Sequence, residues 1–492
     1  MTLDPRKILL VHPLGYRVAA AGRDISRIAN IMPPLGLASI AAYLEQHGVR
    51  ADIIDCYAHP DSDRTIRDYL RRERPAFLGL SCTTSSFLDG VRITRLAKSE
   101  LPGLRAVFGG PHVSALKEQV LADYPDVDCV VVGEGEETLR ELLAAGPGAD
   151  GEVRGLVIRQ GDGTAHFTGH REPLLDLDTL PFPAYHKLAG FPQAYRLPIF
   201  NYPKAPNTSC LSSRGCPYAC SYCDRSVFRR SFRFNSAEYM VEHLRYLRER
   251  FGIRHVNFYD DQFTFNRQRV IEFCERMAAA ALGMTFNCAV RAEHIDLDLL
   301  KRMKAAGCWM ASLGIESGDP QLLAQHRQNP DLDMLAGKIR LIKQAGIRTK
   351  GLLMMGLPGE SEASIRRSME YVFSLPIDDF NLAKFTPFPG SPLYEKIHEL
   401  GRFDEDWEKM DCMHFQFVPH GMTRERLEEL FTLFYKSHFR RPGVIHGYVA
   451  MIWKSPDSWK RFILNLVDFV RFARGSRRLA DGVDPCGPEP RP

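Results

Sequence analysis

Three cysteines in one short segment constrain this chain more than any other feature of its sequence. Cys216, Cys220 and Cys223 form a Cx3Cx2C motif, and the other nine of the twelve cysteines are scattered singly. Three thiolates on one loop can bind zinc or an iron–sulfur cluster. A structural zinc site needs a fourth ligand, which Cys210 or a nearby histidine could supply. Because no fourth cysteine stands at paired spacing, the motif favours a four-iron cluster that leaves one iron open to a substrate.

The rest of the composition is that of an ordinary globular protein. Of 492 residues, 45% are hydrophobic and 25% are charged, which argues against a disordered, collagenous or coiled-coil chain. A formal charge of +4 is too close to balance to indicate a nucleic-acid binder. No apolar run reaches the length of a membrane span, and we expect no signal peptide. Scattered single cysteines are typical of a reducing compartment, so we expect a cytoplasmic protein.

The first part of the chain alternates short apolar runs with helical lengths. Strands are expected at residues 7–11, 51–55, 77–81, 105–108 and 129–132. This alternation predicts a doubly wound, Rossmann-like α/β sheet, which binds ligands beyond the carboxyl ends of its strands. Turns rich in glycine, serine and threonine follow those ends, at residues 81–86, 109–112 and 133–136. The sequence therefore places a ligand site at this edge without identifying the ligand.

A second series of strands and helices begins after the cysteine motif. Strands are expected just before Cys216 and at residues 256–259, 285–290, 309–314, 349–355 and 380–385. Each of these strands ends in polar or glycine residues. Six such strands predict a partial or full β/α barrel whose chemistry lies at the carboxyl ends of the strands.

Two further segments complete the expected organisation. Residues 153–167 indicate a hairpin around a Gly-Asp-Gly turn, and residues 180–183 indicate an extended linker. The chain is helical and partly basic from about residue 422, and residues 459–474 indicate either a packing helix or a helix on a membrane interface. We therefore expect a Rossmann-like domain, a hairpin with linker, a barrel and a helical C-terminal region, at residues 1–147, 148–203, 204–415 and 416–492.

The cysteine motif and its surroundings resemble the radical S-adenosylmethionine (radical SAM) superfamily. Ser213-Arg214-Gly215 precedes the motif, and Tyr222 stands just before its last cysteine. Similar motifs follow the expected barrel strands, at residues 259–263, 290–293, 314–318, 356–360 and 388–390. In the first part of the chain, residues 33–36, 109–112 and 133–136 (PPLG, GGPH and GEGE) look like the cobalamin-binding branch. That branch includes the anaerobic magnesium-protoporphyrin IX monomethyl ester cyclase and many carbon methylases, and the resemblance covers roughly residues 5–395.

The resemblance implies that Cys216, Cys220 and Cys223 hold a [4Fe–4S] cluster whose open iron binds S-adenosylmethionine (SAM). An electron from a donor such as flavodoxin or ferredoxin would cleave SAM and give a radical that removes hydrogen from an unactivated C–H bond. The backbone near Tyr222 would then face the adenine of SAM.

Further SAM-binding residues follow from the same resemblance. Asp260 and Asp261 stand where the superfamily usually has a Gly-Gly-Glu type motif that meets the methionyl amine, and a carboxylate suits an ammonium group. Arg291 would bind the SAM carboxylate through its forked guanidinium. Glu316 would bind the ribose hydroxyls, and Gly356 opens a turn in the same ring of strand ends.

Cobalamin is the third cofactor that the resemblance implies. Many cobalamin domains carry Asp-x-His-x-x-Gly, whose histidine binds the cobalt from below. Here His12 begins a His-x-x-Gly run, but Leu10 replaces the aspartate, so the sequence does not support a lower axial histidine. Backbone N–H groups of the strand-end turns would cradle the nucleotide tail. The residues expected there are Ser81, Thr83, Gly109, Gly110, Gly133 and Glu134.

Three functions stay open from the sequence. The first is methylation of an unactivated carbon by a cobalamin-dependent radical SAM enzyme. The second is radical cyclisation or oxidative ring formation on a tetrapyrrole- or lipid-like substrate. The third is a zinc-stabilised, non-catalytic binding module. The apolar and basic C-terminal segment favours a lipid-like or other bulky apolar small-molecule substrate and a peripheral contact with the inner face of the membrane.

Overall fold

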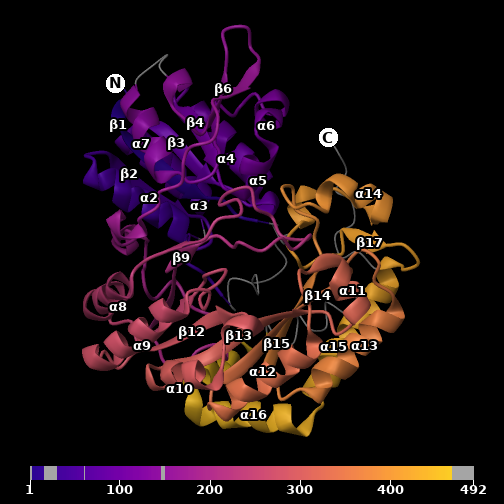
Figure 1. Cartoon of the computed structure of the whole chain (residues 1–492). Helices are drawn as coiled ribbons and strands as arrows, with labels where there is room; N and C mark the ends of the chain where they lie inside the picture. Colours follow the sequence, from indigo (N-terminus) through magenta and orange to yellow (C-terminus); the bar gives the residue numbers. More distant parts are fainter. Residues whose placement is uncertain (1–2, 16–29, 60, 146–149, 468–492) are drawn as a thin grey trace.

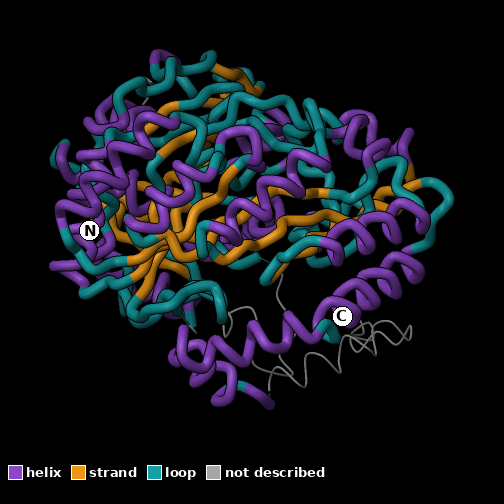
Figure 2. Tube along the Cα trace, turned by 60° about the horizontal axis from the view of Figure 1, so that its bottom comes forward, coloured by secondary structure: helices purple, strands orange, loops and turns teal. Residues whose placement is uncertain are grey.

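The protein is described by a computed structural model that covers residues 3–15, 30–59, 61–145 and 150–467 (Figure 1). Two α/β units are stacked, with the first at the top of Figure 1 and the second below it. A run of helices near the C-terminus covers the lower side of the second unit (Figures 1 and 2). The α/β fold class predicted from the sequence is confirmed.

The first unit is built on one seven-stranded sheet, in the order β2-β1-β3-β4-β5-β6-β7. Neighbours among β1 to β5 are parallel, whereas β6 and β7 are antiparallel. The predicted hairpin is confirmed as β6 and β7, and its pairing with β5 extends this sheet. The strands are β1 Asp4–His12, β2 Arg50–Asp55, β3 Pro75–Ser81, β4 Arg105–Gly109, β5 Cys129–Val131, β6 Leu156–Arg159 and β7 Ala165–Phe167.

Helices cover both faces of this sheet because successive side chains of a strand point to opposite faces. In β1, Leu10 packs into the core that contains α2 and α7, whereas Leu9 and Val11 pack into the core that contains α3 and α4. The helices are α2 Leu35–Gln46, α3 Ser62–Glu73, α4 Phe87–Glu100, α5 Pro111–Leu116, α6 Glu118–Asp123 and α7 Glu136–Ala145. The sheet is therefore doubly wound, as predicted.

The second unit contains six parallel strands in the order β15-β14-β13-β12-β11-β8. Because the outermost strands β15 and β8 do not pair with each other, the sheet is a partial barrel. The strands are β8 Asn207–Cys210, β11 His255–Phe258, β12 Thr285–Val290, β13 Cys308–Glu316, β14 Arg348–Met355 and β15 Asp379–Lys384.

Side-chain caps begin the barrel helices. Ser361 caps α13 by accepting the N–H of Ser364. Ser236 caps α8 in the same way, by accepting the N–H of Tyr239. The helices are α8 Ala237–Phe251, α9 Arg267–Ala280, α10 Leu297–Ala305, α11 Pro320–His326, α12 Leu332–Gln344 and α13 Glu362–Ser374.

Two small ribbons and four α-helices lie outside the two sheets and the helices described above. They are β9 Ser213–Arg214 with β10 Arg233–Phe234, β16 Gly401–Phe403 with β17 Phe417–Pro419, α14 Ile397–Leu400, α15 Arg424–Phe439, α16 Pro442–Lys454 and α17 Pro456–Leu464. No helix within residues 3–15, 30–59, 61–145 and 150–467 is both long and apolar enough to cross a membrane. The helix predicted at 459–474 corresponds in part to α17, and its last seven residues lie outside the described residues.

Candidate functional site

A cavity of about 600 Å3 lies where the carboxyl ends of the first sheet meet the cysteine loop of the second unit. Its lining brings together nine of the fifteen residues predicted from the sequence. These are Ser81, Gly109, Gly110, Gly133, Glu134, Cys216, Cys220, Cys223 and Asp261. The other six lie outside the lining, and these are Thr83, Tyr222, Asp260, Arg291, Glu316 and Gly356.

The two ends of the cysteine loop, residues 215–232, lie side by side. The loop joins β9 to β10, which pair antiparallel through Arg214 and Arg233. Gly215 begins the loop at a φ of +85°, and a Cβ there would collide with the carbonyl oxygen of Ser231. Only glycine adopts this conformation without strain, so the turn before the first cysteine depends on it.

Ser221, between the second and third cysteines, ties the loop to the barrel. Its N–H donates to the carbonyl of His326 over 3.0 Å, and its Oγ lies 2.9 Å from Nδ1 of the same residue. The Nε2 atom of His326 lies 2.8 Å from the carbonyl oxygen of Pro358. The loop is thereby fixed to the end of α11 and, through His326, to the turn that follows β14. Sequence reasoning missed His326, because a lone histidine at a helix end carries no motif.

The three thiols differ in exposure and in acidity. Cys220 is buried, Cys216 is half-buried and Cys223 is exposed. A hydrogen bond with the Cys223 thiol lowers the pKa of Cys220 to about 5 and raises the pKa of Cys223. Within the described residues, no three His, Cys, Asp or Glu side chains form a group that could hold one metal ion. A four-iron cluster takes its three thiolates on three different irons, so it does not require three ligands to converge on one metal ion.

Arg291 and Glu316 lie on the barrel side of the cysteine loop. The Arg291 guanidinium carbon is 3.5 Å from the ring centre of Tyr218, a residue of the loop. Glu316 has a φ of +63°, and burial raises its pKa to about 7, although Arg327 acts in the opposite direction. The charges of Cys220 and Arg291 also act on Glu316. Arg291 and Glu316, both predicted to bind SAM, thus lie close enough to Cys220 for the charges of the three groups to interact.

The two adjacent aspartates after β11 have different surroundings. Asp260 is 3% exposed and accepts the N–H of Ser212 over 2.7 Å, together with the hydroxyls of Ser212 and Ser213. Arg269 lies 3.8 Å from the same carboxylate. Asp261 lines the cavity, and burial raises its pKa. Asp260 therefore holds the segment that leads into the cysteine loop, and Asp261 is the member of the pair that faces the cavity.

Glycines form much of the wall that the first sheet contributes to the cavity. Gly110 has a φ of +102°, and a Cβ there would collide with the backbone of Cys82. Ser81 ends β3 and lines the cavity, whereas Thr83 caps the following turn, where its N–H donates to Ser86 over 3.0 Å. A wall of backbone and small side chains lets a large group approach closely, which fits the cobalamin predicted here.

Gly356 begins a turn that is closed by a buried carboxyl group. Its φ is +94°, and its N–H donates to Glu360, which is 2% exposed. Burial raises the pKa of Glu360 to about 8, although the N–H groups of Gly356 and Leu357 act in the opposite direction. Glu360 therefore stays largely protonated in the folded protein at neutral pH.

The Glu360→Gln variant should lose the part of the pH dependence of the unfolding free energy that comes from protonation of Glu360. Between pH 4.5 and 8 the folded protein binds more protons at Glu360 than the unfolded chain, so this contribution falls as pH rises. We expect the wild type to lose about 2 kcal/mol of unfolding free energy relative to Glu360→Gln from pH 5 to 7. Denaturant titrations at both pH values measure the difference. Glu362→Gln is the control, because arginines lower the pKa of Glu362 to about 2. The prediction would be refuted if the unfolding free energies of the wild type and Glu360→Gln changed equally between pH 5 and 7.

Comparison with known protein families matches the two units separately. The B12 binding domain matches residues 24–143, and the radical SAM superfamily matches residues 211–372. The first match contains the glycine-lined wall of the cavity, and the second contains the cysteine loop and the barrel strands β11 to β14.

Similar proteins cover nearly the whole chain. An uncharacterised methyltransferase of Pyrococcus horikoshii is 28% identical over 459 residues, which are 90% of this chain and 96% of the relative. The anaerobic magnesium-protoporphyrin IX monomethyl ester cyclase of Rubrivivax gelatinosus is 27% identical and covers 86% of this chain and 75% of its own length. The solved structure of OxsB, a cobalamin-dependent SAM radical enzyme with aqua-cobalamin and SAM bound, shares the fold. It has a TM-score of 0.70 and 18% identity, and covers 95% of this chain and 75% of its own.

Proposed function

This chain joins a B12-binding domain to a domain of the radical SAM superfamily, and from that premise we propose that it methylates an unactivated carbon of a small molecule. The observation that carries the proposal is the cavity, whose two walls come from the two domains. One wall holds the cysteine thiols, and the other is the glycine-lined edge of the first sheet. A substrate in this cavity would lie between a source of radicals and a source of methyl groups.

The cofactors of this enzyme are a [4Fe–4S] cluster, SAM and cobalamin. When bound, they supply a radical that removes hydrogen from carbon and a methyl group that replaces it. We propose that Cys216, Cys220 and Cys223 hold the cluster, in agreement with the low pKa of Cys220. The turns at Ser81, Gly109, Gly110, Gly133 and Glu134 are proposed to border the cobalamin site.

The barrel side of the loop supplies groups for the polar parts of SAM. Arg291 presents a guanidinium that suits a carboxylate, and the Glu316 carboxyl can bind hydroxyl groups. Asp261, with a carboxyl that faces the cavity, suits the ammonium group, whereas the oxygens of Asp260 are already engaged. We therefore assign the ammonium contact to Asp261 alone.

Apolar side chains dominate the remainder of the cavity wall. They exclude water from reactive intermediates and favour a bulky apolar or lipid-like substrate. They include Leu10, Leu35, Leu37, Ile40, Leu80, Val107, Val131 and Leu139.

Product analysis after anaerobic reconstitution tests the reaction. With SAM, cobalamin and a reductant such as flavodoxin or ferredoxin, methylation yields S-adenosylhomocysteine and 5′-deoxyadenosine together with a product heavier by one CH2 unit. The similarity to a cyclase keeps ring formation as the second candidate, which would instead give loss of hydrogens or gain of oxygen without a new methyl group. Deoxyadenosine without any methylated product would refute the methylation proposal. Zinc without labile sulfide would favour the non-catalytic module.

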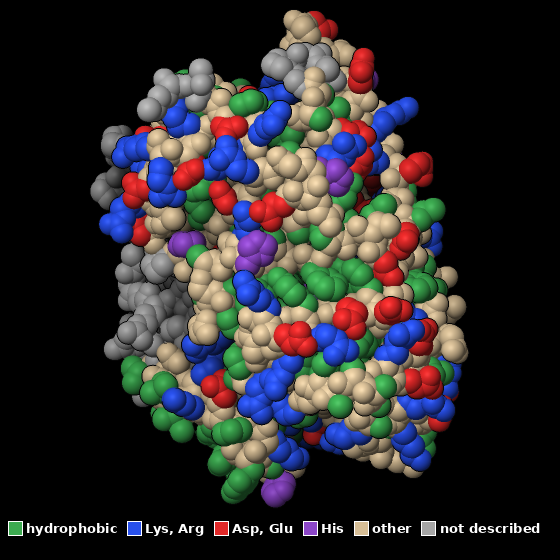
Figure 3. All heavy atoms as spheres, turned by 90° about the vertical axis from the view of Figure 1, so that its left-hand side faces the viewer, with side chains coloured by type: hydrophobic (Ala, Val, Ile, Leu, Met, Phe, Trp, Pro, Cys, Tyr) green, Lys and Arg blue, Asp and Glu red, His purple; other side chains and the backbone are tan. Residues whose placement is uncertain are grey.

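We also propose that the protein works in the cytoplasm and attaches peripherally to the inner face of the membrane through α16 and α17. Tyr448 and Met451 hold α16 against Asp379 and Arg348, the first residues of β15 and β14. Other side chains of α16 are apolar and exposed, among them that of Trp453, which is 77% exposed. Figure 3 shows hydrophobic and basic side chains at the lower end of the molecule, where Figure 1 places α16. The exposed apolar residues of α16 and the following segment are Ile445, Val449, Ile452, Trp453, Ile463, Leu464, Leu466 and Val467.

Charge favours an anionic lipid surface over a second copy of the chain as the partner of this face. Residues 431–467 contain six Lys or Arg residues, of which Arg461 is buried, and one acidic residue, Asp457. A symmetric contact between two copies would place like charges together, whereas anionic headgroups complement them. Apolar side chains ringed by basic ones are typical of interfacial helices.

Replacing Ile445 and Trp453 by glutamate should weaken binding to anionic vesicles at least about tenfold, because two apolar side chains leave the bilayer. Flotation with vesicles that contain phosphatidylglycerol measures the change. Leu175→Glu is the matched control, since Leu175 is 79% exposed on a different part of the chain. Equal flotation of the double variant and the wild type would refute the proposal. So would dimerisation through this face without vesicle binding.

A further inference from the structure

Four charged side chains connect the two walls of the cavity. Arg214 donates to Glu134 and to Glu136, each over 2.6 Å, and Arg233 pairs with Glu134 over 2.8 Å. We call these residues the interdomain ion cluster. The arginines lie on β9 and β10, whereas Glu134 lies on the turn between β5 and α7 and Glu136 is the first residue of α7. The cluster therefore joins residues more than 70 positions apart in the sequence.

The interdomain ion cluster is largely withdrawn from solvent. The side chains of Arg214 and Glu134 are each 15% exposed, that of Glu136 is 9% exposed and that of Arg233 is 6% exposed. Ser39 donates to Glu136 over 2.8 Å. Burial alone would raise the pKa of Glu136, but Arg214 outweighs burial and holds the pKa below its usual value. Glu136 is thus ionised at neutral pH, and direct pairs with arginine fix the positions of both carboxylates.

Buried ion pairs contribute little net stability compared with apolar packing, so their value lies in the geometry that they impose. Here the geometry concerns the cysteine loop. Arg214 lies two residues before Cys216, and Arg233 pairs with Arg214 at the other end of the loop. Glu134 lines the cavity from the opposite wall. Both ends of the cysteine loop are therefore held to the turn that borders the proposed cobalamin site.

We propose that the interdomain ion cluster is a positioning device that keeps the cysteine loop in register with the β5–α7 turn, so that radical formation and methyl transfer act on the same substrate carbon. This inference rests on the proposed function. It gives Glu134 a role different from direct cofactor binding, because both carboxylate oxygens are paired with arginine. A small displacement between reacting groups lowers the rate of their reaction steeply. A disturbed cluster should therefore waste SAM, which is cleaved without methylation.

The test measures how tightly SAM cleavage is coupled to methylation in Glu136→Gln. The reconstituted holoenzyme is assayed anaerobically for methylated product and 5′-deoxyadenosine, and its iron and cobalamin contents are measured alongside. We expect unchanged cofactor contents and a product-to-deoxyadenosine ratio about tenfold below that of the wild type. Hydrogen exchange of the cysteine loop should also become faster, which gives a readout independent of turnover. Arg214→Lys retains the charge and should restore part of the ratio relative to Arg214→Gln.

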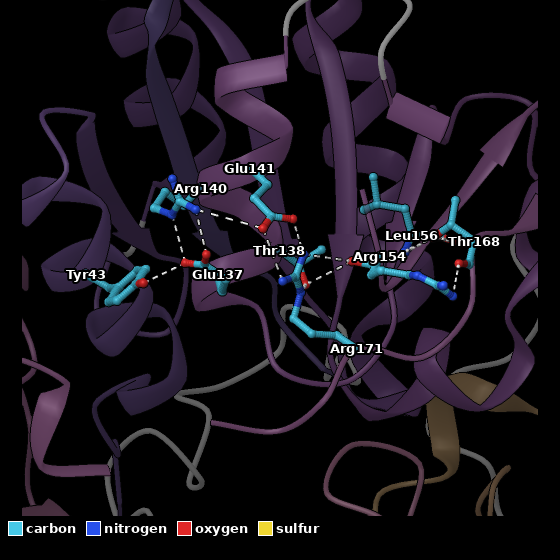
Figure 4. Close-up of polar contacts among 9 residues, drawn as sticks. All are labelled: Tyr43, Glu137, Thr138, Arg140, Glu141, Arg154, Leu156, Thr168 and Arg171. Atoms are coloured by element: carbon cyan, nitrogen blue, oxygen red, sulfur yellow. Dashed lines mark hydrogen bonds and ion pairs between the residues drawn. The ribbon is translucent and has the colours of Figure 1, made fainter. Parts of the chain in front are cut away.

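A matched control comes from the same helix. Glu141 of α7 pairs with Arg171, and the neighbouring Glu137 pairs with Arg140 and Tyr43, in a network on the first domain (Figure 4). Glu141→Gln removes a comparable carboxylate that does not line the cavity. Its product ratio should equal that of the wild type.

The outcomes separate the two proposals. A wild-type ratio and wild-type loop exchange in Glu136→Gln would overturn the positioning role while leaving the methylation proposal intact. An equal fall of the ratio in Glu141→Gln would also overturn it, since the effect would then be general. If the wild type itself forms no methylated product, the proposed function fails. In that case, faster hydrogen exchange of the cysteine loop in Glu136→Gln would still support the positioning role of the interdomain ion cluster.

Discussion

Replacing Cys220 by alanine should abolish SAM cleavage and most of the iron–sulfur absorbance together. Cys220 is the buried member of the three thiols, and its thiol is hydrogen-bonded to that of Cys223. Two remaining cysteines cannot hold three of the four irons. We therefore expect 5′-deoxyadenosine to fall below detection after anaerobic reconstitution, with iron and sulfide per chain well below the wild-type values.

The matched control for Cys220→Ala is Cys412→Ala. Cys412 is half-buried like Cys216, but it belongs to none of the cavity walls. Its replacement should leave iron, sulfide and SAM cleavage at the wild-type level. Full cluster content in Cys220→Ala would contradict the assignment of this residue as a ligand, and loss of the cluster in both variants would show only general instability.

Replacing Asp260 by alanine should lower the free energy of unfolding by about 3–5 kcal/mol, because it leaves Arg269 buried without its nearest carboxylate. The side chain of Arg269 is 3% exposed, and burial already lowers its pKa. The same substitution removes the acceptor of the Ser212 N–H and of the Ser213 hydroxyl. Denaturant titration of the protein, followed by circular dichroism, measures the change.

The adjacent aspartate provides the comparison for Asp260→Ala. Asp261→Asn keeps the shape of a side chain that faces the cavity, and we expect it to change the unfolding free energy by less than about 1 kcal/mol. It should instead raise the concentration of SAM needed for half-maximal cleavage, in agreement with the proposed ammonium contact. Similar losses of stability in the two variants would contradict the distinction between them.

The strands could be predicted because their patterns are local. Buried parallel strands appear as short apolar runs, and residues 77–81, predicted as a strand, lie within β3 Pro75–Ser81. Helix ends were less certain, since Asn235 and Ser236 are both good caps and only tertiary contacts decide between them. Asn235 instead donates to Asp178 of the segment that precedes the barrel.

The candidate site was predictable in its parts but not in its pairings. Carboxyl ends of strands gather at one edge by topology, so the cysteines, Gly109 and Gly133 were expected to be near ligands. The sequence contains no signal that Glu134 is neutralised by Arg214, because 80 residues separate them. Nor could it distinguish Asp260 from Asp261, whose different roles arise from the serines and the arginine around one of them.

In the C-terminal region, too, the sequence could not show which residues tertiary contacts cover. Its apolar and basic residues were evident, but they indicated either a packing helix or an interfacial helix at residues 459–474. The structure places the most exposed tryptophan of the described region, Trp453, on α16. Which side of a helix stays exposed depends on the elements that cover the other side, here the first residues of β14 and β15.

The position of α16 has a practical consequence for handling the enzyme. This helix covers the amino ends of the barrel strands, whereas the cavity lies at their carboxyl ends. A surface, an electrode or a fused reporter attached through α16 would therefore leave the cavity mouth facing the solution. Oriented immobilisation of this kind would let electron donors and substrates exchange freely while every molecule is held in the same direction.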